Sequence, residues 1–301
     1  MNAPVKLMDA QAALGFVVSQ RTHIETQVLQ TPTPEVMYPR LVPVDTSAPA
    51  YAPSVTFFTQ DLIGKAKFIN GKGDDIPLAN SMRAKFEQMI NMGGIGYSFS
   101  LEELGAAQLM GQSLSADGAM AARMASDFTI DELAFIGNEQ LGVEGLFNTT
   151  GITSVAASNT FANLTPAAIL ALINTQMGAM MAATNGIDMP DTLIVPISAF
   201  AELSRPRSDN SDTTVLSYIK TNNVLTAQTG RPLTVLASWR LTDTAVLYKR
   251  DPLVVKMHMP MPLQFVAPQA RNLEIYVPGM FRVAPVSIRR PNAVRYLTGV
   301  A

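Results

Sequence analysis

The chain contains the stretch Gly94-Ile95-Gly96-Tyr97-Ser98-Phe99-Ser100-Leu101-Glu102-Glu103-Leu104-Gly105, which opens its longest predicted helix. Ser100 and Glu103 have the spacing of a capping box, in which each side chain bonds the other residue's backbone N–H. No proline occurs from Ser100 to Gly137. We therefore expect one helix through most of this stretch, about 50 Å long at 1.5 Å per residue.

This predicted helix carries a narrow stripe of apolar and small residues. They recur at steps of three and four: Leu104, Ala107, Gly111, Leu114, Gly118, Ala121, Ala125 and Phe128. Each glycine in a helix costs roughly 1 kcal/mol relative to alanine. The helix must therefore be held by tertiary contacts, and a coiled coil is not favoured.

Before this helix the sequence predicts an arm and a hairpin. Residues 9–30 have the spacing of a short amphipathic helix, capped by Asp9. Six prolines follow between Pro32 and Pro53, so we expect an extended arm that lies across the same or a neighbouring subunit, with a flexible linker as the alternative. Residues 54–68 favour strands and 70–75 a turn, which together predict a long hairpin.

Beyond the predicted long helix the sequence mixes helices and strands. Thr165-Pro166 starts a helix that ends at Asn185-Gly186, and its uncharged surroundings, 163–187, favour a buried or interfacial helix over a membrane span. A strand at 193–195 and a helix at 198–203 follow. The later strand-like stretches are 233–236, 245–248, 253–257, 273–277 and 281–288. The fold class that we expect is α+β.

The composition indicates a protein whose surface is partly covered by neighbouring subunits. The chain is 48% hydrophobic and only 15% charged, whereas about 25% charge is usual. Low charge is typical of buried interface cores, although an ordinary enzyme with little charge is an open alternative. A net charge of −2 without a large basic cluster argues against a sequence-reading nucleic-acid binder. The N-terminus lacks the apolar region of a signal peptide, so we expect a cytoplasmic product.

No pattern in the sequence indicates catalysis, a cofactor or a metal. Cysteine is absent, which excludes thiolate sites and disulfides, and the two histidines, His23 and His258, are far apart. Gly93-Gly94-Ile95-Gly96 lacks the pattern of a phosphate loop and indicates tight packing or a bend. The adjacent acids at 74–75, 102–103 and 131–132 do not converge as catalytic pairs must. We expect a protein that is not an enzyme.

The order of elements resembles the major capsid proteins of tailed bacteriophages, which have the Hong Kong 97-type fold. The motifs that carry the resemblance include 41–46, 64–67, 74–78, 94–105, 145–148, 248–252 and 289–291. The resemblance implies an N-terminal arm at 1–50 and an E-loop hairpin at 51–81. It implies a peripheral domain with a spine helix at 82–150 and an axial domain at 151–265. Strands at 266–301 are expected to return to the peripheral domain.

The resemblance also implies a function and partners. Hexamers and pentamers of the chain would form an icosahedral shell around double-stranded DNA, assembled in the host cytoplasm without a membrane. A portal protein and separate scaffolding or decoration proteins would be partners, and DNA contact would be nonspecific. Charged residues named as subunit-interface candidates, each of which can equally be solvated, are Lys65, Lys67, Asp74, Asp75, Arg250 and Arg290. The rivals are an encapsulin-type compartment shell and a soluble enzyme, which would form only small oligomers.

Overall fold

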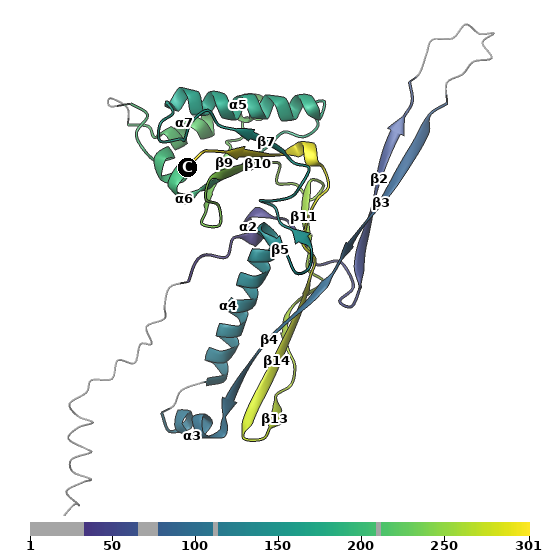
Figure 1. Cartoon of the computed structure of the whole chain (residues 1–301), viewed down its shortest axis with the longest axis vertical. Coiled ribbons are helices and arrows are strands. Elements are labelled where there is room, and N and C mark those ends of the chain that lie inside the picture. Colours follow the sequence, from purple (N-terminus) through teal and green to yellow (C-terminus); the bar gives the residue numbers. More distant parts are fainter. Residues whose placement is uncertain (1–32, 66–77, 111–113, 209–211) are drawn as a thin grey trace, which may run out of the picture. The chain divides into compact units, whose positions relative to one another are not determined.

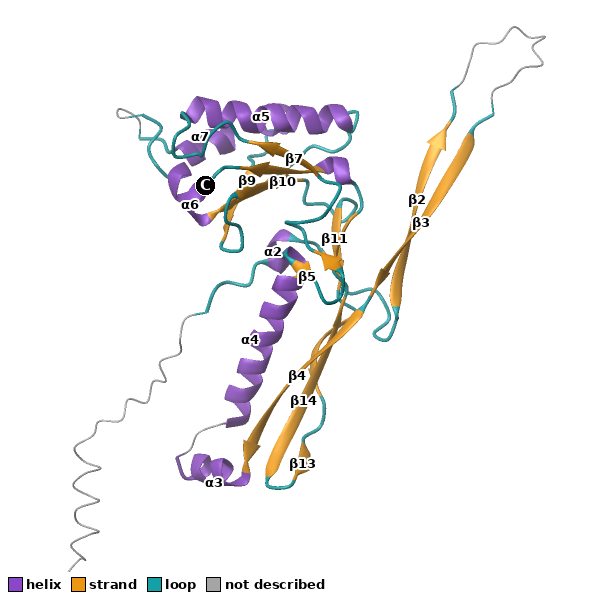
Figure 2. Cartoon of the chain, viewed as in Figure 1, coloured by secondary structure: helices purple, strands orange, loops and turns teal. Residues whose placement is uncertain are grey.

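A computed structural model describes residues 33–65, 78–110, 114–208 and 212–301 (Figure 1). Contacts divide the chain into two units, Met1–Glu35 and Val36–Ala301, and the second contains all the helices and strands described below. Figure 2 shows that both kinds of element are abundant, which confirms the α+β class. The helix predicted at 9–30 and the turn predicted at 70–75 lie outside the described residues.

The predicted hairpin consists of β2 (Ser54–Ile63) and β3 (Asn80–Met89). The strands are antiparallel and pair along their whole length, from Ser54 opposite Met89 to Ile63 opposite Asn80. The boundary expected at residue 81 falls inside the second strand. On β3, apolar residues occupy every second position at Met82, Ala84 and Phe86.

A second long strand pair supports the predicted long-helix region. β4 (Asn91–Ser100) is antiparallel to β14 (Glu274–Val283) over ten residue pairs. On its other side β14 pairs with β12 (Met261–Phe265) and β13 (Gln269–Arg271). A Cβ atom at Gly93 would lie 2.3 Å from Cζ of Phe281, so this ring packs directly on the backbone. The tight packing expected of the glycine-rich segment is confirmed.

Two helices replace the single predicted long helix. They are α3 (Leu101–Met110) and α4 (Leu114–Phe135), and residues 111–113 between them are not described. The predicted capping box is confirmed: Ser100 Oγ accepts from the N–H of Glu103 at 3.1 Å, and the Glu103 carboxylate accepts from the N–H of Ser100 at 2.9 Å. The first helix ends just before Gly111, where helix propensity is low.

The buried face of α4 differs from the predicted stripe by one residue. Ala122, Ser126 and Ile130 are buried, whereas Ala121 is exposed and Phe128 is only partly buried. Steps of four residues therefore describe the packed face of this helix. Its early turns lie on β4, because Gly118 leaves room for the Tyr97 ring: a Cβ at Gly118 would lie 2.7 Å from Tyr97 Cδ2.

The other half of the unit is a five-stranded sheet with helices on one face. Its order is β7 (Thr153–Ala156), β16 (Val294–Thr298), β10 (Thr244–Tyr248), β8 (Thr192–Pro196) and β9 (Thr234–Ser238). The helices are α5 (Pro166–Ala183), α6 (Ile197–Leu203), α7 (Val215–Thr221) and α8 (Val224–Thr229). They share a core with one face of the sheet, and the opposite face joins the core beneath α4 and β14. All of β8 is buried for this reason.

The helix predicted from Thr165-Pro166 is confirmed as α5. Thr165 Oγ1 accepts from the N–H of Ala168 at 3.3 Å, as a cap should. Beyond the helix Asn185 and Gly186 take left-handed φ angles of 51° and 78°, so the turn that ends it also forms as expected. The core side of α5 contains Ile169, Ile173, Met177 and Met180.

Smaller sheets complete the unit, and the last strand corrects one expectation. β1 (Val44–Asp45), β11 (Val255–His258) and β15 (Val286–Ile288) form one sheet, and β5 (Gly137–Asn138) pairs with β6 (Val143–Glu144). α2 (Tyr38–Leu41) precedes β1, and the 3-10 helix η1 (Pro291–Ala293) leads into β16. Strands at 266–301 were expected to return together to the peripheral domain. Instead β16 inserts into the five-stranded sheet, where Tyr296 and Leu297 point into the two opposite cores.

Candidate assembly surfaces and ionic networks

The β2–β3 hairpin has an apolar face that the chain leaves open. Opposite residues of an antiparallel pair point to the same side, so Val55, Phe57, Ala84 and Phe86 share one face. The rings of Phe57 and Phe86 stack with centroids 5.4 Å apart. Even so, Phe86 is 49% exposed, and Met82 on the same face is 63% exposed. No third strand within the described ranges pairs with this hairpin.

The other face of the hairpin is charged. It contains Arg83, Lys85 and Glu87, with Phe58 among them. Glu87 accepts a hydrogen bond from Ser54 Oγ at 2.6 Å and an ionic contact from Lys85 Nζ at 3.3 Å. The Ser54 bond, followed by Lys85, lowers the pKa of the Glu87 carboxyl. The hairpin is thus an amphipathic ribbon, and its apolar face is the better candidate for burial against another surface.

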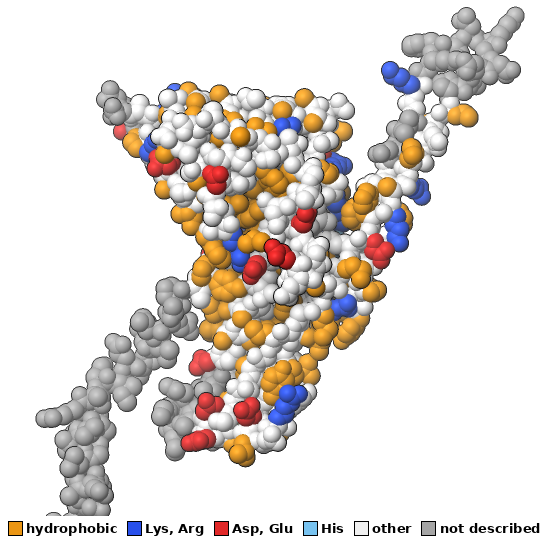
Figure 3. Space-filling model, viewed as in Figure 1, with side chains coloured by type: hydrophobic (Ala, Val, Ile, Leu, Met, Phe, Trp, Pro, Cys, Tyr) orange, Lys and Arg blue, Asp and Glu red, His pale blue; other side chains and the backbone are white. Residues whose placement is uncertain are grey.

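Figure 3 shows apolar side chains along the hairpin as well as over the rest of the unit. Of the 17 large apolar side chains that are exposed in the described part of the chain, seven lie between residues 51 and 92. These seven are Tyr51, Phe58, Leu78, Met82, Phe86, Met89 and Met92. An exposed apolar surface of this kind marks a place where proteins associate.

The base of the hairpin contacts the residues on either side of β15. The guanidinium of Arg289 lies 4.6 Å over the ring of Phe57. Gln88 donates from Nε2 to the backbone oxygen of Pro285. These contacts cover the base of the apolar face, where Val55 and Phe57 are half-buried, and leave Met82 and Phe86 exposed.

An ionic network around Asp45 holds the three-stranded sheet together. Lys256 donates to Asp45, and His258 Nδ1 lies 3.5 Å from the same carboxylate. Arg289 Nη2 lies 3.3 Å from His258 Nε2. Arginine can only donate, so this contact requires Nε2 to accept and places the proton of a neutral imidazole on Nδ1, facing Asp45. Two basic side chains therefore face one carboxylate, and Arg289 contacts the second of them, His258.

The network shifts the ionisation of two of its members. The hydrogen bond from Lys256, followed by bonds from Ser47, holds the pKa of Asp45 far below its usual range. Burial lowers the pKa of His258, and the charges of Lys256 and Arg289 lower it further, against the opposing effect of Asp45. The imidazole is consequently held in its neutral form.

Asp131 on α4 is the centre of a second, buried network. It accepts from the N–H groups of Met37 and Tyr38 at 2.8 and 2.9 Å, and from Arg240 Nε at 2.7 Å. Arg240 also donates from Nη2 to the Phe128 oxygen at 3.3 Å. Sequence reasoning missed this network, since it treated Asp131 only as half of an adjacent acidic pair. No local signal pairs residues that are 109 positions apart.

Two of the six interface candidates make hydrogen bonds within the chain. Arg290 Nη1 lies 3.0 Å from both oxygens of Asp188, which also accepts from Lys249 Nζ at 3.0 Å. Arg250 donates from Nη2 to the Pro39 oxygen at 3.3 Å. These bonds occupy part of each side chain, and an interface role for Arg250 and Arg290 stays a prediction.

The other four candidates come from the segment predicted to form the hairpin. Lys65 follows β2 and is exposed, while Lys67, Asp74 and Asp75 lie outside the described residues. The six residues are thus not brought together in one described cluster. Within the described ranges, no three acidic or histidine side chains gather in a way that could hold a metal ion.

Helix α5 is long and apolar enough, by length and composition, to span a membrane. Such a helix is weak evidence by itself, because core helices pass the same test. The inner side of α5 packs in the core with the five-stranded sheet. This packing agrees with the buried or interfacial helix predicted from the sequence.

Comparison with known proteins identifies the family. The model of the family described as "Major capsid protein" matches residues 64–300. The chain belongs to the major capsid protein family. No curated protein sequence matches this capsid protein. Its fold is nevertheless widespread among solved structures.

Solved structures show that this capsid protein has the Hong Kong 97-type fold of tailed-phage capsids. The capsid of Myoviridae phage XM1 aligns with a TM-score of 0.79 and 18% identity, covering 94% of this chain and 98% of that chain. The capsid of an empty GTA particle aligns with a TM-score of 0.63 and 11% identity, covering 97% of this chain and 98% of that chain. A virus-like particle from Pyrococcus furiosus aligns with a TM-score of 0.54 and 15% identity, covering 86% of this chain and 90% of that chain. The predicted relationship to tailed-phage capsid proteins is confirmed, and the protein is a shell-forming subunit of a virion capsid.

Proposed function

We propose that copies of this capsid protein assemble as hexamers and pentamers into an icosahedral shell around the double-stranded DNA of a tailed phage. The observation that carries the proposal is the open apolar face of the β2–β3 hairpin. A two-stranded hairpin is marginally stable in water unless a further surface covers it. A neighbouring copy is the natural cover in a closed shell, where every subunit has the same surroundings or nearly so.

Several finer features belong to the same proposal. The role is structural and not catalytic, and assembly takes place in the host cytoplasm. A portal protein and separate scaffolding or decoration proteins are the expected partners. DNA contact is nonspecific, in keeping with a net charge of −2. Interface contacts are proposed at Lys65, Lys67, Asp74, Asp75, Arg250 and Arg290.

The domain division is proposed with two changes, at the end of the hairpin and at β16. The arm covers 1–50 and the hairpin runs to Met89, where β3 ends. The peripheral domain follows to about residue 150. The axial domain contains the five-stranded sheet and therefore includes β16 as well as 151–265.

Negative-stain electron microscopy of the purified protein after gel filtration tests the proposal. Shells, tubes or regular five- and six-membered rings support it. A uniform monomer or dimer, even with scaffolding protein supplied, contradicts it. Shells that contain a copurified enzyme and no DNA would instead favour an encapsulin-type compartment.

A further inference from the structure

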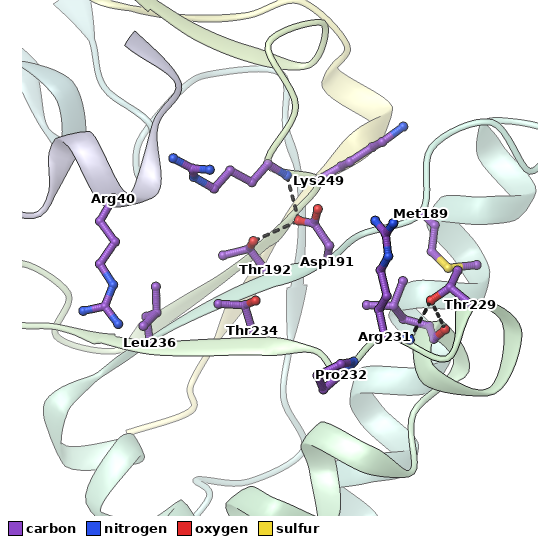
Figure 4. A pocket seen from close by; sticks show the side chains of 12 residues that line it. Arg40, Met189, Asp191, Thr192, Thr229, Arg231, Pro232, Thr234, Leu236 and Lys249 are labelled. Carbon is purple, nitrogen blue, oxygen red and sulfur yellow. Dashed lines mark hydrogen bonds between the residues drawn. The ribbon is translucent and has the colours of Figure 1, made fainter.

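A cavity of about 690 Å³ lies beside the five-stranded sheet, where the segments that enter β8 and β9 meet the end of β10 (Figure 4). Its lining includes apolar side chains, among them Met189 and Leu236, and the hydroxyl-bearing Thr234. A space of this size can hold a ligand as large as a nucleotide. None of the contacts that define the shell-forming hairpin involves this cavity.

The cavity is strongly cationic in a protein that is acidic overall. Its charged lining residues are Arg40, Arg231, Lys249, Arg250 and one acid, Asp191. Four positive charges and one negative charge give a formal +3, against −2 for the whole chain. Such a concentration of cations in a concave site attracts anions.

The charges are not all neutralised by the protein. Lys249 donates to Asp188 at 3.0 Å, and Arg250 uses one nitrogen on the Pro39 oxygen. Arg231 is different: its backbone N–H donates to Thr229 Oγ1 at 3.2 Å, but its guanidinium has no hydrogen bond or ion pair with any described residue. Figure 4 shows that this side chain extends from the strand-entry segment toward Asp191.

Asp191 uses one carboxylate oxygen within the chain and keeps its negative charge, which is already counted in the lining. Its Oδ1 accepts from Thr192 Oγ1 at 2.8 Å and from the N–H of Arg250 at 2.8 Å. Arg231 and the remaining nitrogens of Arg250 are therefore the donors left for a ligand. Arginine donors in a planar fork match the oxygens of a phosphate group, and several cations suit a phosphate that carries nearly two negative charges.

We propose that this cavity is a phosphate-binding site, in which Arg231 and Arg250 bind the oxyanion and Arg40 and Lys249 supply positive potential. The phosphate can belong to a small molecule, such as a nucleotide, or to a nucleic-acid backbone. Asp188 offsets the charge of Lys249, so four positive charges and two negative ones leave a formal +2. A single carboxylate from a second copy would offset half of this charge, whereas a phosphate with nearly two negative charges offsets almost all of it. The inference does not depend on the shell function, because it follows from the cavity alone.

Equilibrium dialysis of the full-length protein with labelled inorganic phosphate tests the site. We expect saturable binding that Arg231→Ala weakens at least tenfold. The affinity of Arg231→Lys for phosphate should lie between those of the wild type and Arg231→Ala, because lysine keeps the positive charge but lacks the planar set of donors of a guanidinium. The matched control is Arg271→Ala, which removes the same charge from an exposed arginine stacked on Tyr276 and should change affinity less than twofold. Circular dichroism confirms that each variant is folded.

A duplex oligonucleotide, added as competitor, distinguishes the two sources. Displacement of phosphate by the duplex supports a nucleic-acid backbone, and binding that the duplex does not displace supports a small phosphate ligand. Absence of saturable binding to the wild type overturns the proposal, as does equal weakening by Arg231→Ala and Arg271→Ala. If phosphate does not bind but Arg231→Glu blocks assembly, the cavity instead accepts a carboxylate of a second copy.

Discussion

Arg240 donates from Nε to Oδ2 of Asp131 across 2.7 Å, and the two side chains are only 7% and 1% exposed. The other oxygen of Asp131 accepts from the N–H groups of Met37 and Tyr38. One carboxylate therefore connects α4, the start of α2 and the segment after β9. A charge this deeply buried is tolerated only while all of its partners are present.

Replacing Arg240 by alanine leaves Asp131 charged and buried without its main partner. We expect the free energy of unfolding to fall by about 3–5 kcal/mol, measured by denaturant titration of unassembled subunits. The control is Arg207→Ala, which removes an arginine stacked 4.0 Å over the ring of Tyr218. That change should cost at most about 1 kcal/mol. Equal losses in the two variants would show that the buried pair has no special role.

The network around Asp45 predicts acid sensitivity. The pKa of His258 lies below its ordinary value because of burial and the nearby Lys256 and Arg289. The unfolded chain therefore takes up a proton below about pH 6.5 while the folded protein resists it. Stability contributed by the neutral imidazole is complete above that pH and is lost as the pH falls. The lowered pKa of Asp45 adds a second loss, below about pH 4.

Melting temperatures between about pH 8 and pH 5 measure the histidine effect before most carboxylates titrate. The wild type should keep a constant value down to about pH 6.5 and then decline. His258→Gln should flatten the decline. The only other histidine is His23, so His23→Gln is the matched control and should preserve the wild-type profile. A decline that survives in His258→Gln would assign the acid sensitivity to other groups.

Short sequence patterns correctly predicted the elements that depend on contacts between residues close in the sequence. The capping box at Ser100 and the start of α5 at Thr165 depend on contacts three residues apart, and both form as expected. The buried strand β8 follows from its apolar run. The resemblance to a family added the long-range arrangement that local patterns do not contain.

The errors arise where distant contacts decide the outcome. The packed face of α4 is set by β4 and the core below it, so the stripe through Ala121 and Phe128 was wrong although its spacing was helical. The partners of Asp131 and Asp45 come from other segments of the chain. Likewise, nothing in residues 294–298 alone indicates that β16 inserts between β7 and β10.

Replacing either of two helical glycines by alanine should change the stability of the subunit, in opposite directions at the two positions. A Cβ at Gly118 would lie 2.7 Å from the Tyr97 ring, whereas a Cβ at Gly105 meets nothing within 4 Å. We expect Gly118→Ala to destabilise the subunit by about 1–3 kcal/mol through overpacking. Gly105→Ala should stabilise it by up to about 1 kcal/mol through helix propensity. Denaturant titration of both variants measures the difference, and stabilisation by both would show that α4 does not pack tightly on β4.

The hairpin offers a matched test of assembly, because it carries exposed phenylalanines on opposite faces. Phe86 belongs to the apolar face and Phe58 to the charged face, with exposed fractions of 49% and 67%. Burying a phenylalanine contributes about 1.5–3 kcal/mol, and about 1.4 kcal/mol corresponds to a tenfold change in an equilibrium constant. Phe86→Ser should therefore raise the subunit concentration needed for shell formation at least tenfold, as measured by sedimentation and electron microscopy. Phe58→Ser should raise it less than threefold. If the more exposed Phe58 proves the more sensitive position, the charged face of the hairpin is the one that contacts the neighbouring copy.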